Sequence, residues 1–396
     1  MTEVCAVACE AENAHYLTPV NHPVQSALVP RCTRFMKSKA KDLPRYWPSM
    51  ALLLVLIIAC LPQDADAHVK WFVSYNLLCP PRAPFAVFCS VYFLGMAAVV
   101  APLMFGVSYA DQRLAQSGFL STGGWALLTQ RLGRAADFIG KHTPDIIRYA
   151  AALFFFILFA YGEFILTPEL KTDAVWVRWL QLAIAVLALS RRTAWIGALG
   201  VAVLYGKAVE QYGLFHMLDY PIFLGVATYI FLWSGFRERT AALADAILRS
   251  FTAVTLLWGG IEKFAYPEWS FGLLSARPEL TFGLNPEFYM VCAGFVEFCA
   301  AYLLISGRLA SRAAAVVLLF FFVSAIIPFG AIDAIGHSVI IVVLLVLAFG
   351  RDNVVSEHLD LRSPRDTAFA HASMFIAVLI LLMGAYYGGH YASFGV

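Results

Sequence analysis

Charged residues are scarce in this chain of 396 residues: Asp, Glu, Lys and Arg make up 14% of it, whereas hydrophobic residues make up 61%. The mean hydropathy of +0.73 lies far from the balance of soluble proteins. The net charge is only +2, and no run of basic residues forms an arm for nucleic acid. We therefore predict an integral membrane protein that contacts the lipid bilayer and binds no nucleic acid.

Several motifs of soluble enzymes and metal proteins are missing. The chain has no P-loop and no G-x-G-x-x-G sequence, which argues against a nucleotide-driven pump. Its eight cysteines include no C-x-x-C pair and form no disulfide framework. No H-x-x-x-H pair and no methionine cluster occur. The prolines of the predicted spans lie towards the helix ends, which disfavours a transporter built on broken helices.

Apolar stretches recur along the chain, and about 20 apolar residues are enough for a helix to cross the hydrocarbon core. We assign them to residues 84–107, 147–166, 175–190, 193–211, 218–236, 246–265, 287–306, 310–329, 336–350 and 368–388. This pattern predicts an all-α fold, a polytopic membrane bundle of about ten transmembrane helices.

The middle part of the sequence contains an internal repeat. The equivalent positions are Glu163 and Glu262, Pro168-Glu169 and Pro267-Glu268, Gln181 and Glu297, Ser190 and Ser306, Tyr212-Gly213 and Phe329-Gly330, and His216 and Asp333. Such long-range similarity indicates a duplicated unit. In membrane proteins, binding sites often lie between repeats.

Residues 259–264, Gly-Gly-Ile-Glu-Lys-Phe, resemble the G-x-x-K signature that opens a unit of the DoxX family. Glu297 early in the next helix and the Gly307-Arg308 turn, followed by small residues, also resemble the pattern of that family. The resemblance covers residues 246–350, and it extends to 147–236 only through the repeat. It implies two tandem DoxX-like four-helix units, in a family that includes proteins of thiosulfate and quinone redox chemistry.

We divide the chain accordingly. The predicted parts are an N-terminal extension and signal sequence (1–67), a periplasmic start with one transmembrane helix and a cytoplasmic amphipathic segment (68–146), the first four-helix unit (147–238), the second unit (246–350), and a C-terminal transmembrane helix (366–396).

The signal sequence is predicted from a basic segment, an apolar run at 50–61 and the sequence Ala65-Asp66-Ala67. Three outcomes fit this pattern. The chain is cleaved after Ala67, it keeps the run as an anchor, or it carries a lipid on Cys60. Cleavage would make His68 the first residue.

Lys and Arg residues are distributed unequally among the loops. Arg148, Arg191, Arg249, Arg308 and Arg351 belong to the richer set, which the positive-inside rule places in the cytoplasm. We therefore predict a multi-pass protein of the bacterial inner membrane with the mature N-terminus and the C-terminus in the periplasm.

Ionisable residues inside predicted spans are costly, about 2.5–3.5 kcal/mol on insertion scales, so their presence suggests a partner or a task. Glu262, Lys263 and Glu297 are the candidate catalytic residues, and Lys263 is predicted to reach Glu297 on the next helix. Lys207 and Glu210, three residues apart, are predicted to form a structural ion pair. Trp258 and Glu163 are candidates for contact with a quinone, since a quinone headgroup favours aromatic walls near a protonatable group.

A second group of candidates lies on the predicted periplasmic side. His68, His216, Asp333 and His337 offer imidazole and carboxylate ligands that suit copper or zinc. His216 and Asp219 are three residues apart, and Asp333 and His337 are four apart, so each pair would share a face if a helix begins there.

Three functions remain open at this point. The first is a membrane subunit of a quinone-linked redox system that faces the periplasm and works with other redox subunits. The second is a periplasm-facing protein for copper handling or transport, and the third is a structural partner without chemistry of its own. The substrate, the reaction and the oligomeric state do not follow from the sequence.

Overall fold

The computed structural model describes residues 75–117, 123–235, 240–349, 353–359, 361 and 363–395. The predicted signal sequence and His68 lie outside the described residues. Across the described ranges the chain is helical, apart from loops and one isolated antiparallel bridge between Phe164 and Lys171. The predicted all-α polytopic bundle is confirmed.

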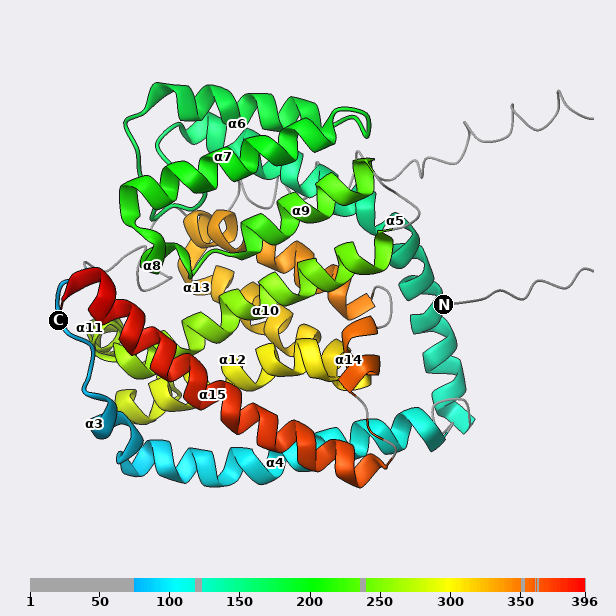
Figure 1. Ribbon diagram of the computed structural model, residues 1–396, viewed down its shortest axis with the longest axis vertical. Helices are drawn as coiled ribbons and strands as arrows, with labels where there is room; N and C mark the ends of the chain where they lie inside the picture. The colour runs from blue at the N-terminus through cyan, green and yellow to red at the C-terminus, as the bar shows by residue number, and fades with distance from the viewer. Residues whose placement is uncertain are drawn as a thin grey trace, which may run out of the picture. The chain divides into compact units, whose positions relative to one another are not determined.

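The elements follow one another along the chain as Figure 1 shows. They are α3 (Pro84–Phe88), α4 (Val91–Ser117), α5 (Gly123–Tyr161), α6 (Val175–Ala188), α7 (Ala194–Tyr212), α8 (Leu214–Met217), α9 (Ile222–Gly235), α10 (Ala241–Ala265), α11 (Glu268–Ala276), η2 (Pro278–Thr281), α12 (Pro286–Ser306), α13 (Leu309–Phe349), α14 (Val354–Leu359) and α15 (Pro364–Phe394).

Each apolar stretch predicted to span the membrane contains a helix, although the helix ends at Tyr161 within 147–166 and begins at Ile222 within 218–236. Among the described residues, six helices are long and apolar enough to cross a membrane: α4, the part of α5 from Ala136, α10, α12, α13 and α15. The helices α6 and α9 are shorter and also apolar. The chain is therefore a multi-pass membrane protein.

Helix α13 contains two of the predicted spans. The chain breaks inside it at Gly330, where φ is 75° and ψ is −154°. Side chains do not readily adopt such angles, so the position requires glycine. The spans predicted at 310–329 and 336–350 are thus the two halves of α13.

The cytoplasmic amphipathic segment predicted within 68–146 belongs to two long helices. Helix α4 continues to Ser117, and the stretch expected as a separate amphipathic helix is the first part of the 39-residue helix α5. Pro144 lies inside α5 without ending it. Gly140, the polar residues 141–143, Pro144 and Asp145 separate the amphipathic stretch from the apolar one, and the helix nevertheless runs through both.

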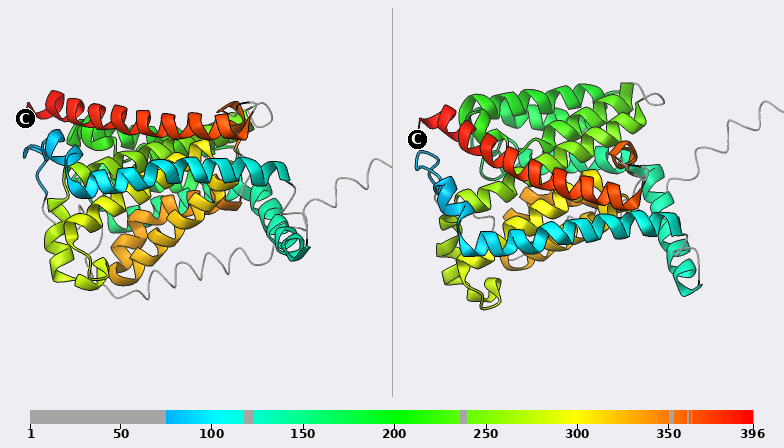
Figure 2. Two further views of the ribbon diagram at one scale, coloured as in Figure 1. Left: turned by 90° about the horizontal axis from the view of Figure 1, so that it is seen from below. Right: turned by 60° about the horizontal axis from the view of Figure 1, so that its bottom comes forward.

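Close packing joins α10 to α12. A Cβ atom at Gly294 would lie 2.5 Å from the Phe264 ring and 3.1 Å from the carbonyl oxygen of Gly260. Small residues allow this approach between membrane helices. Helices α4 and α15, from opposite ends of the described chain, also lie side by side (Figure 2).

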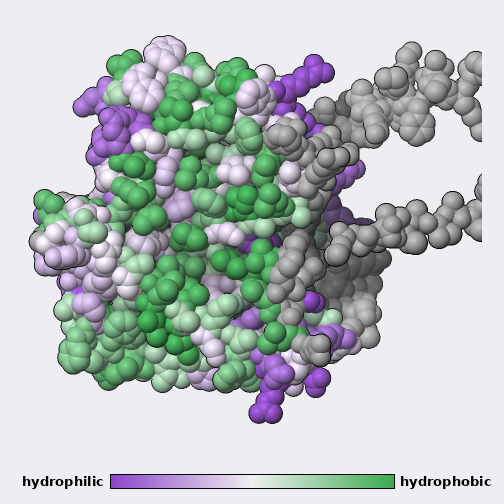
Figure 3. Space-filling view, viewed as in Figure 1, coloured by the Kyte–Doolittle hydropathy of each residue, from purple (hydrophilic) through white to green (hydrophobic). Residues whose placement is uncertain are grey.

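The helix ends define two polar regions. We call the end with His216 and His390, near α8 and α11, the histidine end, and the end with the α6–α7 and α12–α13 turns the arginine end; they lie at the left and right of Figure 1. Hydrophobic side chains dominate the middle of the face in Figure 3, and hydrophilic ones gather towards its sides.

Candidate functional site

Lys263 and Glu297 meet as the sequence predicted. Lys263 Nζ donates to Glu297 Oε2 at 2.5 Å, from the last turn of α10 to the middle of α12. Lys263 Nζ also lies 3.3 Å from the carbonyl oxygen of Gly259. The two side chains are 29% and 17% exposed. The predicted contact is confirmed, and the pair is not sealed inside the protein.

Glu262 and Trp258 lie on the same helix as Lys263. Glu262 is half-buried, and it interacts electrostatically with the phenol of Tyr386 on α15. Trp258 is buried, and its ring packs 4.9 Å from the ring of Tyr386 and 5.6 Å from that of Phe215. The structure therefore places Trp258 in an aromatic core next to Glu262.

The equivalent position of the first unit has a related contact. Gln181 is fully buried in α6, and its Nε2 donates to the carbonyl oxygens of Phe164 and Ile165 at 2.6 and 3.0 Å. Phe164 stands where the second unit has Lys263. A polar side chain of the second helix thus binds the same chain position in both units. Glu163, in contrast, is exposed.

A buried cluster at the histidine end is centred on Glu169. The carboxylate lies 3.0 Å from His216 Nε2, and the two side chains are 3% and 1% exposed. Tyr75 donates its hydroxyl to Glu169 Oε1, and Tyr220 donates to Oε2. Both oxygens of Glu169 accept hydrogen bonds, which stabilises the carboxylate away from water.

Tyr220 is a hydrogen-bond donor in this cluster. Burial, the Glu169 charge and the Asp219 charge raise the pKa of the Tyr220 phenol well above its ordinary value. The phenol therefore keeps its proton at physiological pH. The ring of His216 stacks with those of Tyr75 and Tyr212, with centroids 5.9 and 5.7 Å away.

Of the predicted metal ligands that the structure describes, Asp333 and His337 lie together, whereas His216 pairs with another residue. His216 pairs with Glu169 rather than with Asp219, whereas His337 Nδ1 lies 3.0 Å from Asp333 Oδ2 on one face of α13, as its spacing predicted. In the described part of the chain, no three His, Cys, Asp or Glu side chains group so as to hold a metal ion.

Lys207 and Glu210 form the predicted surface ion pair, with the Lys207 ammonium 3.2 Å from the Glu210 carboxylate. Glu210 is 73% exposed. An exposed pair of this kind contributes little to stability. The predicted ion pair is confirmed.

Residues 75–82 form a strap across the histidine end. Besides the bond of Tyr75, the carbonyl oxygens of Leu77 and Cys79 accept hydrogen bonds from His390 and Tyr266 at 2.9 Å each. Arg82 N donates to Ala265 O, also at 2.9 Å. The strap thereby joins the first unit to α10 and α15.

Arg82 fastens the far end of the strap. Its guanidinium contacts Glu268 at 2.6 Å and Glu287 at 2.5 Å. Partial burial lowers the pKa of Arg82, but the hydrogen bonds and charges of Glu287 and Glu268 outweigh it and raise that pKa overall. Arg82 therefore stays charged and links α11 to α12.

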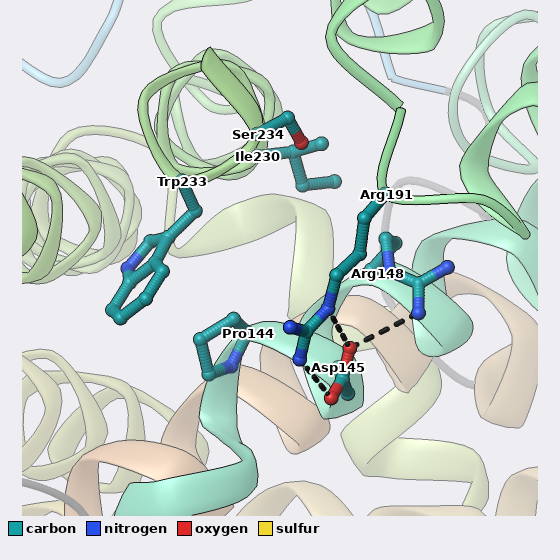
Figure 4. A pocket seen from close by; sticks show the side chains of 7 residues that line it. All are labelled: Pro144, Asp145, Arg148, Arg191, Ile230, Trp233 and Ser234. Carbon is teal, nitrogen blue, oxygen red and sulfur yellow. Dashed lines mark hydrogen bonds and ion pairs between the residues drawn. The ribbon is translucent and has the colours of Figure 1, made fainter. Parts of the chain in front are cut away.

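At the arginine end, a small pocket is dominated by one acidic residue. Asp145 accepts from Arg191 Nε and Nη2 at 3.0 and 2.5 Å and from Arg148 Nη2 at 3.0 Å, beside Trp233 and Ser234 (Figure 4). The Asp145 hydrogen bond raises the pKa of Arg191, against a smaller opposite effect of burial. Asp145 binds both arginines, and the two guanidinium groups and one carboxylate leave the pocket with a net charge of +1.

Two buried arginines occupy equivalent places in the units. Arg148 Nη1 donates to Ala188 O at 2.7 Å, and Arg249 Nη1 donates to Leu304 O at 3.0 Å. Each acceptor lies two residues before the repeated serine, Ser190 or Ser306. The arginines therefore satisfy carbonyl groups left free at the end of a helix.

Asp111 of α4 holds the start of α13. It accepts hydrogen bonds from the backbone N–H groups of Arg308, Leu309 and Ala310 at 2.7, 2.9 and 3.0 Å. Asn353 donates to the carbonyl oxygens of Ile305 and Gly307 at the end of α12. Asp111 and Asn353, which lie outside the DoxX-like segment 246–350, thus fix the Gly307-Arg308 turn.

Sequence reasoning did not identify Glu169, Tyr75, Tyr220 and Tyr386 as site residues. Glu169 was visible in the repeat, since it aligns with Glu268, but nothing local indicates its burial. Tyr75 comes from the strap, 94 residues away from Glu169. Only the folded chain brings Tyr75 and Tyr220 to Glu169.

Comparisons with known proteins agree with the resemblance. Residues 244–331 match the model of the DoxX family. The match contains Lys263 and Glu297, and it does not include Glu169, His216, Asp333 or His337. No curated protein and no solved structure gives a significant match to the chain.

Proposed function

We propose that this multi-pass protein is a membrane subunit of a quinone-linked redox system, and that a quinone headgroup binds beside Lys263 and Glu297. The observation that carries the proposal is the 2.5 Å contact of these two side chains on membrane-spanning helices of the DoxX segment. Charged groups in such helices are expensive to keep and commonly serve a function.

The chemistry of the pair suits a quinone. The Lys263 ammonium is a hydrogen-bond donor for a quinone carbonyl oxygen, and the Glu297 carboxylate is an acceptor for the hydroxyl proton of a quinol. Tyr289 of α12 lies close enough to Lys263 to interact with it electrostatically. The partial exposure of both charged side chains supports access from the surrounding membrane.

The redox balance requires a second protein. Oxidation of a quinol to a quinone releases two electrons and two protons. Glu297 would take up one of the two protons and the second would pass to water at the membrane surface, while the two electrons would pass one at a time to a partner subunit with a one-electron carrier such as a haem. The reverse flow reduces a quinone with the same residues.

The proposed orientation places the histidine end in the periplasm of a bacterial inner membrane. It rests on the excess of Lys and Arg in the loops of the arginine end. The Glu169 cluster and the strap would then face the periplasmic side, where a soluble redox partner can reach them.

The quinone content of the purified protein tests the proposal. Lys263→Met should reduce the co-purified quinone by about tenfold or more, the usual effect of losing a hydrogen bond to a charged group. Lys207→Met removes a lysine from another Lys–Glu pair, exposed at the same end, and should leave the quinone content unchanged. Wild-type protein without quinone, or equal loss in both variants, would contradict the proposal.

A further inference from the structure

The pocket at the arginine end combines a buried cation with an accessible one. Its charged lining residues are Arg148, Arg191 and Asp145, which together carry a net charge of +1. The Arg148 side chain is only 6% exposed, whereas that of Arg191 is 52% exposed. Salt screens a buried charge less than a surface charge. The pocket therefore keeps a positive charge and presents one of its two guanidinium groups to the outside.

Arg191 has donor groups that its carboxylate partner does not use. A guanidinium carries five N–H donors in a planar fork. Asp145 accepts from Nε and Nη2 of Arg191, which form one edge of that fork. Within the described part of the chain, Nη1 makes no hydrogen bond. Arg191 can therefore bind Asp145 and an outside anion together, and a phosphate group matches the geometry of the fork.

Comparison of the two units indicates that Arg191 is not required to form its turn. The second unit has Gly307 at the position of Arg191, and the carboxylate of Asp111 covers the turn that follows. In the first unit the turn closes on itself, with the N–H group of Ala194 donating to the carbonyl oxygen of Ser190 at 3.0 Å. The half-exposed ion pair of Arg191 also adds little to stability. The side chain is thus available for a ligand.

The remaining walls of the pocket are largely apolar. Ile230 and Trp233 of α9 and Pro144 of α5 line it, and Ser234 adds a hydroxyl group (Figure 4). Helix α5 is long and apolar enough from Ala136 to cross a membrane, and α9 is a shorter apolar helix. An anion that carries acyl chains can place its apolar part against these walls, whereas a free phosphate ion cannot.

We propose that the arginine-end pocket binds the phosphate group of an anionic phospholipid, with Arg191 as the hydrogen-bond donor. Arg148 adds attraction through its charge, and Asp145 positions Arg191 while reducing that attraction. Basic pockets between membrane helices are suited to such headgroups. The site lies apart from the Lys263–Glu297 pair, so the proposal stands or fails independently of the quinone function.

Native mass spectrometry of the full chain in detergent measures the lipid affinity, with phosphatidylglycerol as the probe and phosphatidylcholine as the comparison without net charge. The wild-type protein should bind phosphatidylglycerol about tenfold more tightly or better, the usual effect of a hydrogen bond to a charged group. Arg191→Gln should abolish that preference. A wild-type protein without the preference, or a variant that keeps it, would overturn the proposal.

Arg134→Gln is the matched control. Arg134 is an exposed arginine of α5 that does not line the pocket, so the substitution changes the net charge of the protein by the same amount. Its preference for phosphatidylglycerol should equal that of the wild type. Equal loss in both variants would show a general attraction of the charged surface and would overturn the specific site.

Asp145→Asn tests the pocket charge in the opposite direction. The substitution raises the net charge of the lining from +1 to +2, because both arginines remain. It should tighten phosphatidylglycerol binding by about threefold or more, since one carboxylate no longer repels the phosphate. The affinity is determined from the folded protein, so a change in yield does not affect it. Unchanged or weaker binding would contradict the site.

Inorganic phosphate separates the two sources of a phosphate group. Millimolar phosphate should displace little of the bound phosphatidylglycerol, because it makes no contact with the apolar walls formed by Ile230 and Trp233. Complete displacement, or a phosphate adduct in the mass spectrum in place of lipid, would identify a site for free phosphate and would overturn the assignment to a phospholipid.

Discussion

Gly213 and Gly330 share one unusual region of backbone conformation in the two repeated units. Their φ and ψ angles are 84° and 156° in Gly213, and 75° and −154° in Gly330. This region is almost restricted to glycine. Each glycine directly precedes the segment that carries a buried acid–imidazole contact, through His216 in one unit and Asp333 in the other. The equivalence supports the interpretation of a duplicated unit.

Gly213→Ala should destabilise the protein by about 1–3 kcal/mol, because alanine would be held at a strained φ. No neighbouring atom lies within 4 Å of an added Cβ, so the cost comes from the backbone rather than from a clash. Thermal unfolding in detergent measures it. An unchanged midpoint would contradict the backbone argument.

Gly206→Ala is the control for that substitution. Gly206 lies inside α7, also with open space around an added Cβ, and its angles are helical. Alanine stabilises a helix relative to glycine by about 0.5–1 kcal/mol. The two neighbouring substitutions should therefore move the unfolding midpoint in opposite directions.

The positions of helices followed from hydrophobic runs, because a membrane restricts the chain to helices of predictable length. The Lys263–Glu297 contact followed as well, since the long side chain of Lys263 at the end of one membrane-spanning helix can reach Glu297 on the next such helix. The partner of His216 could not be predicted from the sequence. Glu169 lies in the 162–174 loop, and the sequence does not show how that loop folds back on α8.

Contacts across large sequence separations were also beyond prediction. Asp111 binds backbone groups 197 to 199 residues away, and the strap binds His390 from 313 residues away. The repeat revealed equivalent positions inside the units. It contained no information on α4, α15 or the strap, which have no counterpart in it.

Arg249→Met should destabilise the protein by about 1–3 kcal/mol, since the carbonyl group of Leu304 would lose a buried charged donor. Ser311, which also accepts from Arg249, would lose the same partner. Arg192→Met alters an exposed arginine at the α6–α7 turn and should change stability by less than about 0.5 kcal/mol. Denaturation of the two variants in detergent compares them; equal stability would contradict the capping role.

Alkaline phosphatase fused after Val396 should be active, because the positive-inside rule places this terminus in the periplasm. The same enzyme fused near Glu357 should be inactive, because that segment is predicted to be cytoplasmic. Activity of both fusions in intact cells measures the orientation. The opposite pattern would place the Glu169 cluster and the strap on the cytoplasmic side.

Mass analysis of the purified protein should find His68 as its first residue if the signal is cleaved after Ala67. His68 would then offer an amine and an imidazole to copper, and His68→Ala should lower any bound copper. A chain that retains residues 36–67 would rule out that chelate. The quinone experiments do not depend on this outcome.

The last prediction separates structure from chemistry at Lys263 and Glu297. Glu297→Gln should lower membrane expression, because Lys263 would lose its carboxylate partner. Removing one member of a buried ion pair costs about 3–5 kcal/mol. Because the Lys263 and Glu297 side chains are partly exposed, we expect the lower value. Glu287 is unsuitable as a control, since it binds Arg82. Glu163 is exposed, so Glu163→Gln is the control and should have little effect on membrane expression.

The double variant Lys263→Met with Glu297→Leu leaves no unpaired charge, so membrane expression should recover towards the wild-type level. Quinone binding and redox-dependent growth should stay lost, because neither the ammonium donor nor the carboxylate acceptor is present. Expression and growth are measured on the same strains. If both recover, the pair contributes to packing only, and the quinone site must be sought elsewhere in the bundle.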